Sequence, residues 1–191
     1  MQRIGIYGGS FDPVHLGHLL VAQAAREELG LDRLFFIPAA QSPFKQTSTP
    51  LAGTVRAQLL RLALAGKAWC EVDTQEIERR GVSYTIDTLH TCAQRFPKAE
   101  LFYLIGADHA PTLPQWRAAD QMANLARFVI IPRPGKTDAP APPPFKSLTL
   151  KGWPLAVSST EIRARIKNNQ PFDHLVPATV AEAIRNNRLY L

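Results

Sequence analysis

The chain has 191 residues, which is enough for one compact α/β domain with a small helical appendage and short for two full domains. Hydrophobic residues make up 46% of the chain and charged residues 20%, as in an ordinary soluble globular protein. Every apolar stretch is shorter than a bilayer span, and Met1-Gln2-Arg3 leads directly into a short strand and a glycine turn. These features exclude a membrane protein and predict that no signal peptide is present.

The formal charge of +6 predicts an anionic partner, either a nucleic acid or a phosphorylated small molecule. The chain has no run of five basic residues, no arginine-rich arm and no aromatic–basic pattern of the kind found in RNA-binding sheets. We therefore expect a small polyphosphate ligand rather than nucleic acid. A basic surface without any particular partner is the alternative. Whether the protein is a monomer or a homo-oligomer is a separate question, which the sequence leaves undecided.

The two cysteines of the chain, Cys70 and Cys92, form neither a C-x-x-C pair nor a zinc-ligand spacing. Isolated cysteines of this kind are typical of reduced thiols in a reducing compartment. We therefore expect a cytoplasmic protein.

The first predicted strand is the apolar run Arg3–Tyr7, which ends at the glycine pair Gly8-Gly9. Asp12 as N-cap and Pro13 at the first helical position predict that a helix follows. Gly30 is its expected C-cap. Further strands are expected at 34–37, 101–105 and 128–131, and further helices at 55–65, 85–95, 158–167 and 178–187.

Strands that alternate with helices predict an α/β fold, a doubly wound parallel sheet with right-handed crossovers. We expect residues 1–191 to form a single domain whose last part, from about residue 155, is a small helical section. In such sheets ligands collect beyond the carboxyl ends of the strands, so the segments after the predicted strands should converge on one cleft. The proline-rich segment 138–144 is expected to be an extended surface loop rather than a domain linker.

The segment 8–18 (GGSFDPVHLGH) is the most informative stretch of the sequence. It joins a strand to a helix through a glycine turn, where free backbone N–H groups and the helix dipole attract phosphate. His15 and His18 are three residues apart near the start of that helix, which puts both imidazoles on one face beside the turn. Gly17 lies between them, where a missing side chain lets a ligand approach the helix closely.

Other interpretations of this segment are weaker. Its glycines do not form G-x-G-x-x-G, and no Gly-Lys-Ser/Thr follows as in a P-loop. A metal site would need further ligands, but no Glu, Asp or Cys with ligand-like spacing accompanies His15 and His18. Histidines without a role are the remaining alternative, and their position directly after a strand and a glycine turn argues against it. We therefore assign no metal ligand.

The segment resembles the H-x-G-H signature of the nucleotidyltransferases, and closely that of the bacterial nicotinate-mononucleotide adenylyltransferases. Four further segments resemble motifs of that family in order and spacing, and the match covers essentially the whole chain. They are Ser83–Leu89 (SYTIDTL), Ile105–Asp108 (IGAD) with Trp116 downstream, Arg133–Gly135 (RPG) after a strand, and Val157–Arg163 (VSSTEIR).

The resemblance implies a Rossmann-like nucleotidyltransferase that transfers the adenylyl group of ATP to nicotinate mononucleotide, with Mg²⁺ as cofactor, and releases pyrophosphate in NAD biosynthesis. The attacking 5′-phosphate is already ionised, so positioning and charge stabilisation do most of the work. His15 and His18 are implied to act on the α-phosphate and Arg163 on the β- and γ-phosphates. The implied ATP-binding residues are Gly8, Gly9, Ser10, Phe11, Gly106, Asp108, Arg133, Ser158, Ser159 and Thr160.

For the second substrate, the resemblance implies that Lys45 meets the mononucleotide phosphate and that Trp116 stacks on the pyridine ring. Backbone N–H groups at the start of two helices, near Thr85 and Ile86 and at Arg117, are implied to meet the carboxylate. Phe44 stands where the family often has a histidine.

Four rival functions stay open at this point. Phosphopantetheine adenylyltransferases share the fold but are usually shorter and lack the SYTIDTL-type segment and the tryptophan. A preference for the amide form of the mononucleotide keeps the same motifs. A nucleotide-sensing module without chemistry would be expected to lose His15, His18 or Arg163, and a nucleic-acid-binding protein is suggested only by the net charge.

Overall fold

The computed structural model describes residues 1–43, 50–133, 140–153 and 155–191. Its centre is a sheet of six parallel strands in the order β3-β2-β1-β4-β5-β6. The strands are β1 (Arg3–Gly9), β2 (Arg33–Pro38), β3 (Cys70–Val72), β4 (Glu100–Gly106), β5 (Arg127–Ile131) and β6 (Ser147–Thr149). The chain winds outward from β1 to β3 and then returns to place β4 on the other side of β1. The predicted doubly wound, Rossmann-like sheet is therefore confirmed, with its switch point between β1 and β4.

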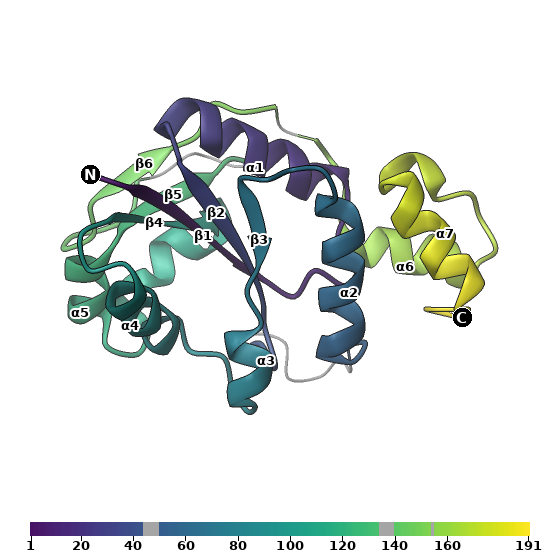
Figure 1. The fold of residues 1–191 in the computed structure, drawn as a ribbon, viewed down its shortest axis with the longest axis horizontal. Coiled ribbons are helices and arrows are strands. Elements are labelled where there is room, and N and C mark those ends of the chain that lie inside the picture. The colour runs from purple at the N-terminus through teal and green to yellow at the C-terminus, as the bar shows by residue number, and fades with distance from the viewer. Residues whose placement is uncertain (44–49, 134–139, 154) are drawn as a thin grey trace.

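Alternate residues of the four central strands, β2, β1, β4 and β5, enter two separate hydrophobic clusters, one on each face of the sheet. In β1, Ile4 and Ile6 pack on one face and Tyr7 on the other. The cluster around Tyr7 includes residues of α1 (Leu16–Leu29) and α2 (Gly53–Leu64). The opposite cluster includes residues of α4 (Thr85–Arg95), the 3₁₀ segment η1 (Ala107–Gln115) and α5 (Ala119–Leu125). Figure 1 shows the same layers, with α1 above the sheet and α4 and α5 below it.

The C-terminal elements lie together at one end of the molecule, next to α2 (Figure 1). They are α6 (Ser159–Lys167), η2 (Asp173–Leu175) and α7 (Ala178–Asn186). Ile162, Val180 and Ile184 from these elements are buried in the cluster that also covers α1 and α2. The last residues of the chain are thereby brought back towards its beginning.

All strands and helices that the sequence predicts are present, and six short elements of the described residues were missed. The missed elements are β3, α3 (Gln75–Arg79), η1, α5, β6 and η2. Strands of three residues and helices of three to seven residues are too short to show a period in the sequence. Pro111 and Pro114 lie inside η1 and remove backbone donors there, which disguises a helical segment.

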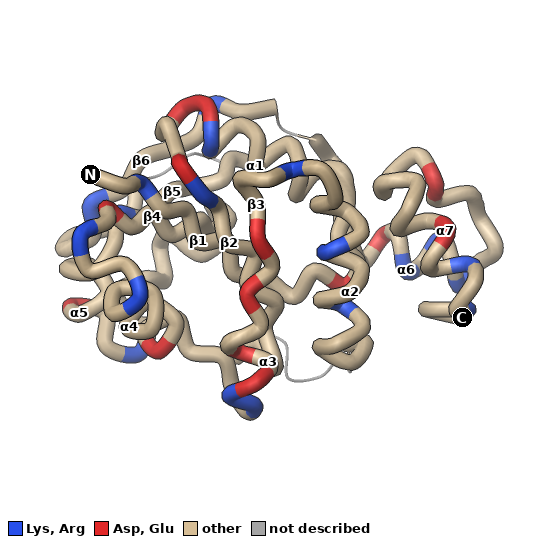
Figure 2. The backbone as a smooth tube through the Cα atoms, viewed as in Figure 1, with Lys and Arg blue, Asp and Glu red and all other residues tan. Residues whose placement is uncertain are grey.

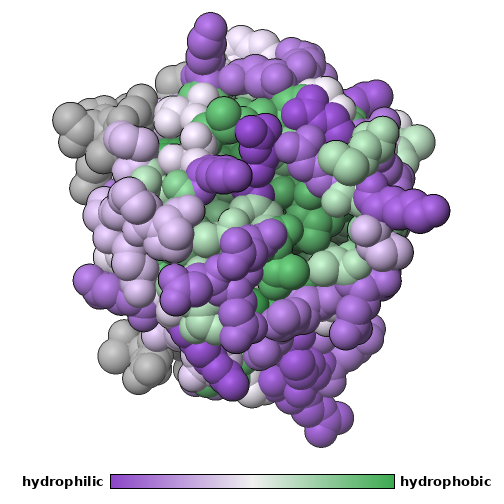
Figure 3. Space-filling view, turned by 90° about the vertical axis from the view of Figure 1, so that its left-hand side faces the viewer, coloured by the Kyte–Doolittle hydropathy of each residue, from purple (hydrophilic) through white to green (hydrophobic). Residues whose placement is uncertain are grey.

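Acidic and basic residues are interspersed along the chain, as around α3 in Figure 2. On the face shown in Figure 3, hydrophilic residues surround a smaller central area of hydrophobic ones. Within the described part of the chain, no helix has the length and apolar character that would be needed to cross a membrane.

Candidate active site

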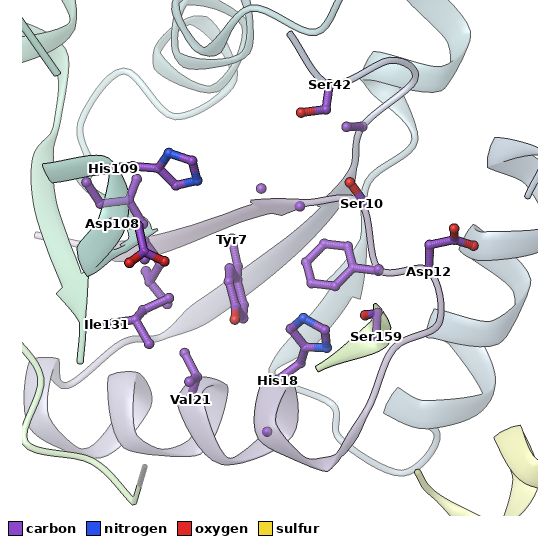
Figure 4. Close-up of a pocket in the computed structure, with 18 of the residues that line it drawn as sticks. Tyr7, Ser10, Asp12, His18, Val21, Ser42, Asp108, His109, Ile131 and Ser159 are labelled. Atoms are coloured by element: carbon purple, nitrogen blue, oxygen red, sulfur yellow. The ribbon is translucent and has the colours of Figure 1, made fainter. Parts of the chain in front are cut away.

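A cleft of about 1510 Å³ lies beyond the carboxyl ends of β1 and β4. Residues from both halves of the doubly wound sheet line it, as the switch point between β1 and β4 predicts. Figure 4 shows Asp108 and His109 on one side of the cleft and Ser10 and Ser159 on the other. Tyr7 lies between the two sides. A ligand with two separated polar ends would fit such a cleft.

The helix after the glycine turn starts later than its sequence predicts. Asp12 and Pro13 are not its N-cap and first residue, because α1 begins at Leu16 and its N-cap is His15. The Asp12 carboxylate is engaged elsewhere: it accepts hydrogen bonds from the Tyr190 hydroxyl at 2.9 Å and the Leu51 N–H at 3.4 Å. Because α1 begins at Leu16 and not at Pro13, His15 and His18 lie at its first turn, where free N–H groups and the helix dipole are concentrated.

The two histidine rings stack on each other, as their spacing predicts. Their centroids are 3.6 Å apart and their planes are inclined by 24°. The Nδ1 atom of His18 accepts the backbone N–H of His15 at 3.1 Å. In the neutral ring this contact places the proton of His18 on Nε2, so the ring can donate a hydrogen bond with that atom.

His15 is uncharged at neutral pH. Burial lowers the pKa of its imidazole to about 4, and the positive charge of Arg133 acts in the same direction. The Nδ1 atom of His15 is buried and has no hydrogen-bond partner among the described residues. A buried polar atom without a partner is uncommon in proteins and is consistent with a functional site.

Side chains at Gly8 and Gly9 would come too close to neighbouring aromatic residues. A Cβ atom on Gly8 would lie 2.7 Å from the Tyr103 hydroxyl oxygen, and one on Gly9 would lie 3.1 Å from the ring of Phe11. Gly17 also lines the cleft. A Cβ there would lie 2.9 Å from Val157 Cγ1 and 3.1 Å from His15 Nδ1. The missing side chain at Gly17 therefore makes room for the protein's own side chains, and the close approach of a ligand stays a prediction.

The start of α6 faces the glycine turn, 150 residues away in sequence. Ser158 is the N-cap of α6, and its hydroxyl accepts the Glu161 N–H at 3.1 Å. The Ser159 hydroxyl donates to the Pro13 carbonyl at 2.9 Å. Arg163 Nη1 donates to the Asp12 carbonyl at 2.7 Å. These contacts fix α6 and its arginine beside the two histidines and create one cationic, donor-rich end of the cleft.

The side of the cleft opposite the start of α6 is formed by the ends of β4 and β5 (Figure 4). Arg133 forms an ion pair with Asp108 at 2.9 Å, and both side chains are partly exposed to the cleft. A Cβ on Gly106 would lie 3.5 Å from Nη2 of Arg133, which is an ordinary van der Waals contact, so the guanidinium lies close to Gly106. The sequence placed these three residues together correctly.

The other end of the cleft is bordered by α4 and η1. Thr85 begins α4, and its hydroxyl lies 3.2 Å from that of Tyr103. Trp116 follows η1, and its indole N–H donates to the Thr112 hydroxyl at 3.2 Å. The Arg117 guanidinium lies over the ring of Tyr84. Because α5 begins at Ala119, the expectation that Arg117 lies at the start of a helix is wrong.

The structure brings sixteen of the eighteen predicted site residues to the same cleft. They are Gly8, Gly9, Ser10, Phe11, His15, His18, Thr85, Gly106, Asp108, Trp116, Arg117, Arg133, Ser158, Ser159, Thr160 and Arg163. The side chain of Ile86 is buried in the hydrophobic cluster under α4, so only its backbone is available there. Lys45 lies outside the described residues, as do Phe44, Pro134 and Gly135.

Sequence reasoning missed Arg56, whose side chain is 1% exposed at the edge of the cleft. Its guanidinium donates to the carbonyls of Leu51, Ser10 and Ala39 at 2.6–2.8 Å. Arg56 therefore ties the glycine turn to the segment that follows β2. It occupies an ordinary helical position in the sequence, and no local pattern marks it.

Glu76 was also missed. It is 4% exposed and accepts the Thr88 hydroxyl at 2.5 Å beneath the Thr85 end of the cleft. Burial raises the pKa of its carboxyl group, while the hydrogen bond from Thr88 opposes this shift. A buried carboxyl group cannot be recognised from sequence alone.

The comparisons with known proteins agree with this geometry. Residues 6–165 match the cytidylyltransferase-like family. The chain is 40% identical to a probable nicotinate-nucleotide adenylyltransferase of Bacillus licheniformis, covering 100% of this chain and 99% of that protein. It is 39% identical, with the same coverage, to the nicotinate-nucleotide adenylyltransferase of Bacillus subtilis.

Solved structures share the fold. Nicotinic acid mononucleotide adenylyltransferase of Plasmodium falciparum, complexed with NaAD, superimposes with a TM-score of 0.77 at 18% identity and covers 100% of this chain and 98% of that chain. Its complex with APC gives a TM-score of 0.78 with the same coverage. These structures show the fold, and the family is shown by the sequence identity over the full length. The chain belongs to the nicotinate-nucleotide adenylyltransferase family, within the cytidylyltransferase-like nucleotidyltransferases.

Proposed function

We propose that this protein is an enzyme that transfers the adenylyl group of ATP to nicotinate mononucleotide, giving nicotinate adenine dinucleotide and pyrophosphate in NAD biosynthesis. The observation that carries the proposal is the pair of stacked imidazoles at the start of α1, placed next to Arg163 in one large cleft. Full-length identity of about 40% to nicotinate-nucleotide adenylyltransferases supports the same reaction.

His15 and His18 bind the α-phosphate of ATP in this proposal. Charge builds on the non-bridging oxygens of the α-phosphate as the mononucleotide phosphate attacks in line and pyrophosphate leaves. Because His18 Nδ1 accepts a backbone N–H, the ring can donate from Nε2 and strengthen that hydrogen bond as this charge develops. The backbone N–H groups of Ser10 and Phe11, which follow the end of β1 at Gly9, add fixed donors that need no reorganisation during the reaction.

Arg163 and the start of α6 hold the leaving pyrophosphate. Arg163 is anchored through Nη1 on the Asp12 carbonyl, and its Nη2 donates to the Thr160 hydroxyl at 3.4 Å. A planar guanidinium fixed in this way presents its remaining N–H groups in a geometry that suits phosphate oxygens. Ser158, Ser159 and Thr160 add hydroxyl groups and backbone N–H groups at the positive end of α6.

Asp108 and Arg133 bind the nucleoside half of ATP. The Asp108 carboxylate at the end of β4 can accept hydrogen bonds from ribose hydroxyls. Its ion pair with Arg133 keeps the carboxylate charged and oriented. Gly106 lines the cleft beside Arg133 and is assigned to the same half of ATP.

The acceptor occupies the other end of the cleft. Trp116 stacks on the pyridine ring, and the free N–H groups of Thr85 and Ile86 at the start of α4 bind the carboxylate. The Arg117 N–H contributes from a loop position. Lys45 is assigned to the mononucleotide phosphate from its place in the sequence.

Mg²⁺ is the cofactor in this proposal. Among the residues that the structure describes, no group of three or more His, Cys, Asp or Glu side chains is arranged as a metal site. Mg²⁺ is often held by substrate phosphates and water with one or two carboxylates. The residues of the cleft therefore fit an ion that is held chiefly by ATP, where it would shield the phosphate charges.

We further propose that residues 1–191 act as one domain in the cytoplasm. Both cysteines are unpaired and buried, as in a reducing compartment. The partners required are the two small substrates.

The test is pyrophosphate release by the purified protein with ATP and Mg²⁺, offering nicotinate mononucleotide, nicotinamide mononucleotide or phosphopantetheine as acceptor. We expect rapid release with nicotinate mononucleotide and formation of the dinucleotide by chromatography. Faster release with phosphopantetheine would refute the proposal, and the His18→Ala variant is the control for contaminating activity.

A further inference from the structure

One buried carboxylate joins the two ends of the chain beside the phosphate end of the cleft. The side chain of Asp12 is 9% exposed, and Figure 4 shows it directed away from Tyr7 and His18. Its Oδ1 atom accepts the hydroxyl of Tyr190, the second residue from the end of the chain, at 2.9 Å. Its Oδ2 atom lies 3.9 Å from Nη1 of Arg163. A carboxylate is thus held next to the arginine assigned to the polyphosphate.

The position of Tyr190 is fixed by α7 and not by the cleft. The Leu189 N–H donates to the Ile184 carbonyl at 3.0 Å, and the Tyr190 backbone has a left-handed φ of 68°. The side chain of Tyr190 packs on the hydrophobic cluster that includes α2 and α7. A non-glycine residue is held in this conformation only where its surroundings stabilise it.

The Tyr190 hydroxyl can only donate to Asp12 at ordinary pH. Burial, followed by the negative charge of Asp12, raises the pKa of this phenol well above its usual value. The phenol therefore stays protonated, and its hydrogen bond to a carboxylate is of the stronger, charge-assisted kind.

The orientation of Asp12 matters because its carboxylate has the same sign as the substrate. Arg163 uses Nη1 on the backbone carbonyl of Asp12, at 2.7 Å, and not on the nearby carboxylate. If the carboxylate were free to turn, it could form a full ion pair with Arg163 and compete directly with phosphate oxygens. The hydrogen bond from Tyr190 opposes that rotation.

We propose that Tyr190 is a positioning residue for the transfer reaction: its hydroxyl holds the Asp12 carboxylate in place so that Arg163 stays available to the polyphosphate of ATP. This inference rests on the proposed function, because it assigns the polyphosphate to Arg163. It predicts an effect on ATP and not on the acceptor, although neither Tyr190 nor the end of α7 lines the cleft.

The test compares full-length variants by steady-state kinetics and by calorimetric binding of a non-hydrolysable ATP analogue. Tyr190→Phe removes the hydroxyl and keeps the ring, and it should raise the KM for ATP about five- to tenfold, since a charge-assisted hydrogen bond is lost. The KM for nicotinate mononucleotide should stay within about twofold of the original value. Leu191→Ala is the matched control, because its side chain is 82% exposed at the next position.

The double variant Asp12→Asn/Tyr190→Phe separates positioning from a general loss of stability. Neutralising residue 12 removes the competitor for Arg163, so the double variant should recover ATP affinity relative to Tyr190→Phe. Unchanged ATP affinity in Tyr190→Phe would overturn the inference. So would a loss that the second substitution does not relieve, or equal losses for both substrates with a lowered Tm. Failure of the original chain to form dinucleotide would instead refute the proposed function, and analogue binding would still test the role of Tyr190.

Discussion

The two ends of the cleft differ in how their polar groups are held. The phosphate end is the part of the cleft formed by the starts of α1 and α6. Its side chains are fixed by contacts between distant parts of the chain, such as Arg163 on the Asp12 carbonyl and Ser159 on the Pro13 carbonyl. The pyridine end is the part bordered by α4 and η1. Its assigned groups come from the middle of the chain, and several are backbone N–H groups near Thr85 and Arg117. The first end depends on side-chain chemistry and tertiary contacts, whereas the second depends largely on where a helix begins.

This difference has a consequence for mutagenesis. A side-chain substitution can remove a donor at the phosphate end, where His18 and Arg163 supply it. The backbone donors at the pyridine end survive any side-chain substitution that leaves α4 in place. We therefore expect the largest losses of activity at the phosphate end, and changes of specificity or modest losses at the other.

The largest effect is expected for His18→Ala. Loss of one donor to the developing charge should lower kcat by about 10²-fold or more, with a smaller change in substrate binding. Single-turnover rates together with KM values would measure both. His90→Ala is a matched control, since His90 is an exposed residue of α4 that contacts Gln121. Near-normal turnover in His18→Ala would contradict the assignment of the histidines.

The second-largest effect is expected for Arg163→Ala. Loss of a charged hydrogen-bond donor should lower kcat/KM for ATP about 10- to 100-fold. Arg163→Lys should also be impaired, because an ammonium group cannot reproduce two parallel N–H donors. Titration with an ATP analogue separates binding from chemistry. Lys167→Ala removes an exposed charge from the same helix and should behave like the original chain. Unchanged ATP affinity and turnover in Arg163→Ala would remove α6 from the ATP site.

At the pyridine end, the preference between two acceptors should reveal the role of the backbone donors. An amide would leave one of the N–H groups near Thr85 and Ile86 unpaired, at a cost of about 1–3 kcal/mol. The ratio of kcat/KM for nicotinate over nicotinamide mononucleotide should therefore be about 10 to 100. Trp116→Ala should weaken both acceptors together and leave this ratio unchanged. Equal values for the two acceptors would show that helix N-termini do not select the acid.

The smallest effect concerns stability and is confined to acid pH. The pKa of His15 is about 4 in the folded protein, against an ordinary value near 6.5 in the unfolded chain. Between these values the unfolded chain binds more protons, so folding stability should fall as the pH drops below 6.5 and stay constant above it. We expect His15 to contribute about 1 kcal/mol to the loss of stability between pH 7 and pH 5.5.

Urea unfolding of His15→Asn at these two pH values would measure that contribution. Asn is a good N-cap, so the variant should fold, and its stability should depend less on pH than that of the original chain. His90→Asn should keep the original pH dependence because His90 is exposed. An unchanged pH dependence in His15→Asn would show that burial does not depress this pKa.

The sequence alone determined the sheet and most of the candidate site. Continuous apolar runs such as 101–105 mark strands that are buried on both faces, and the rule for parallel sheets then predicts one cleft at their carboxyl ends. The motifs at 8–18 and 105–108 lie at those ends, so their convergence followed from topology. The motif at 157–163 was assigned to the same site by its resemblance to the family, since no strand was predicted before it.

Only the tertiary structure decided how these groups are supported. Asp12 looks like a helix N-cap in sequence, but Tyr190 and the Leu51 N–H engage its carboxylate and α1 starts at Leu16. Arg56 and Glu76 are buried polar residues whose partners come from other elements, and no local pattern marks them. Gly17 accommodates Val157, which is 140 residues away. Hydrogen bonds and close packing between distant segments leave no period or spacing in a sequence, because they depend on where the folded backbone brings each side chain.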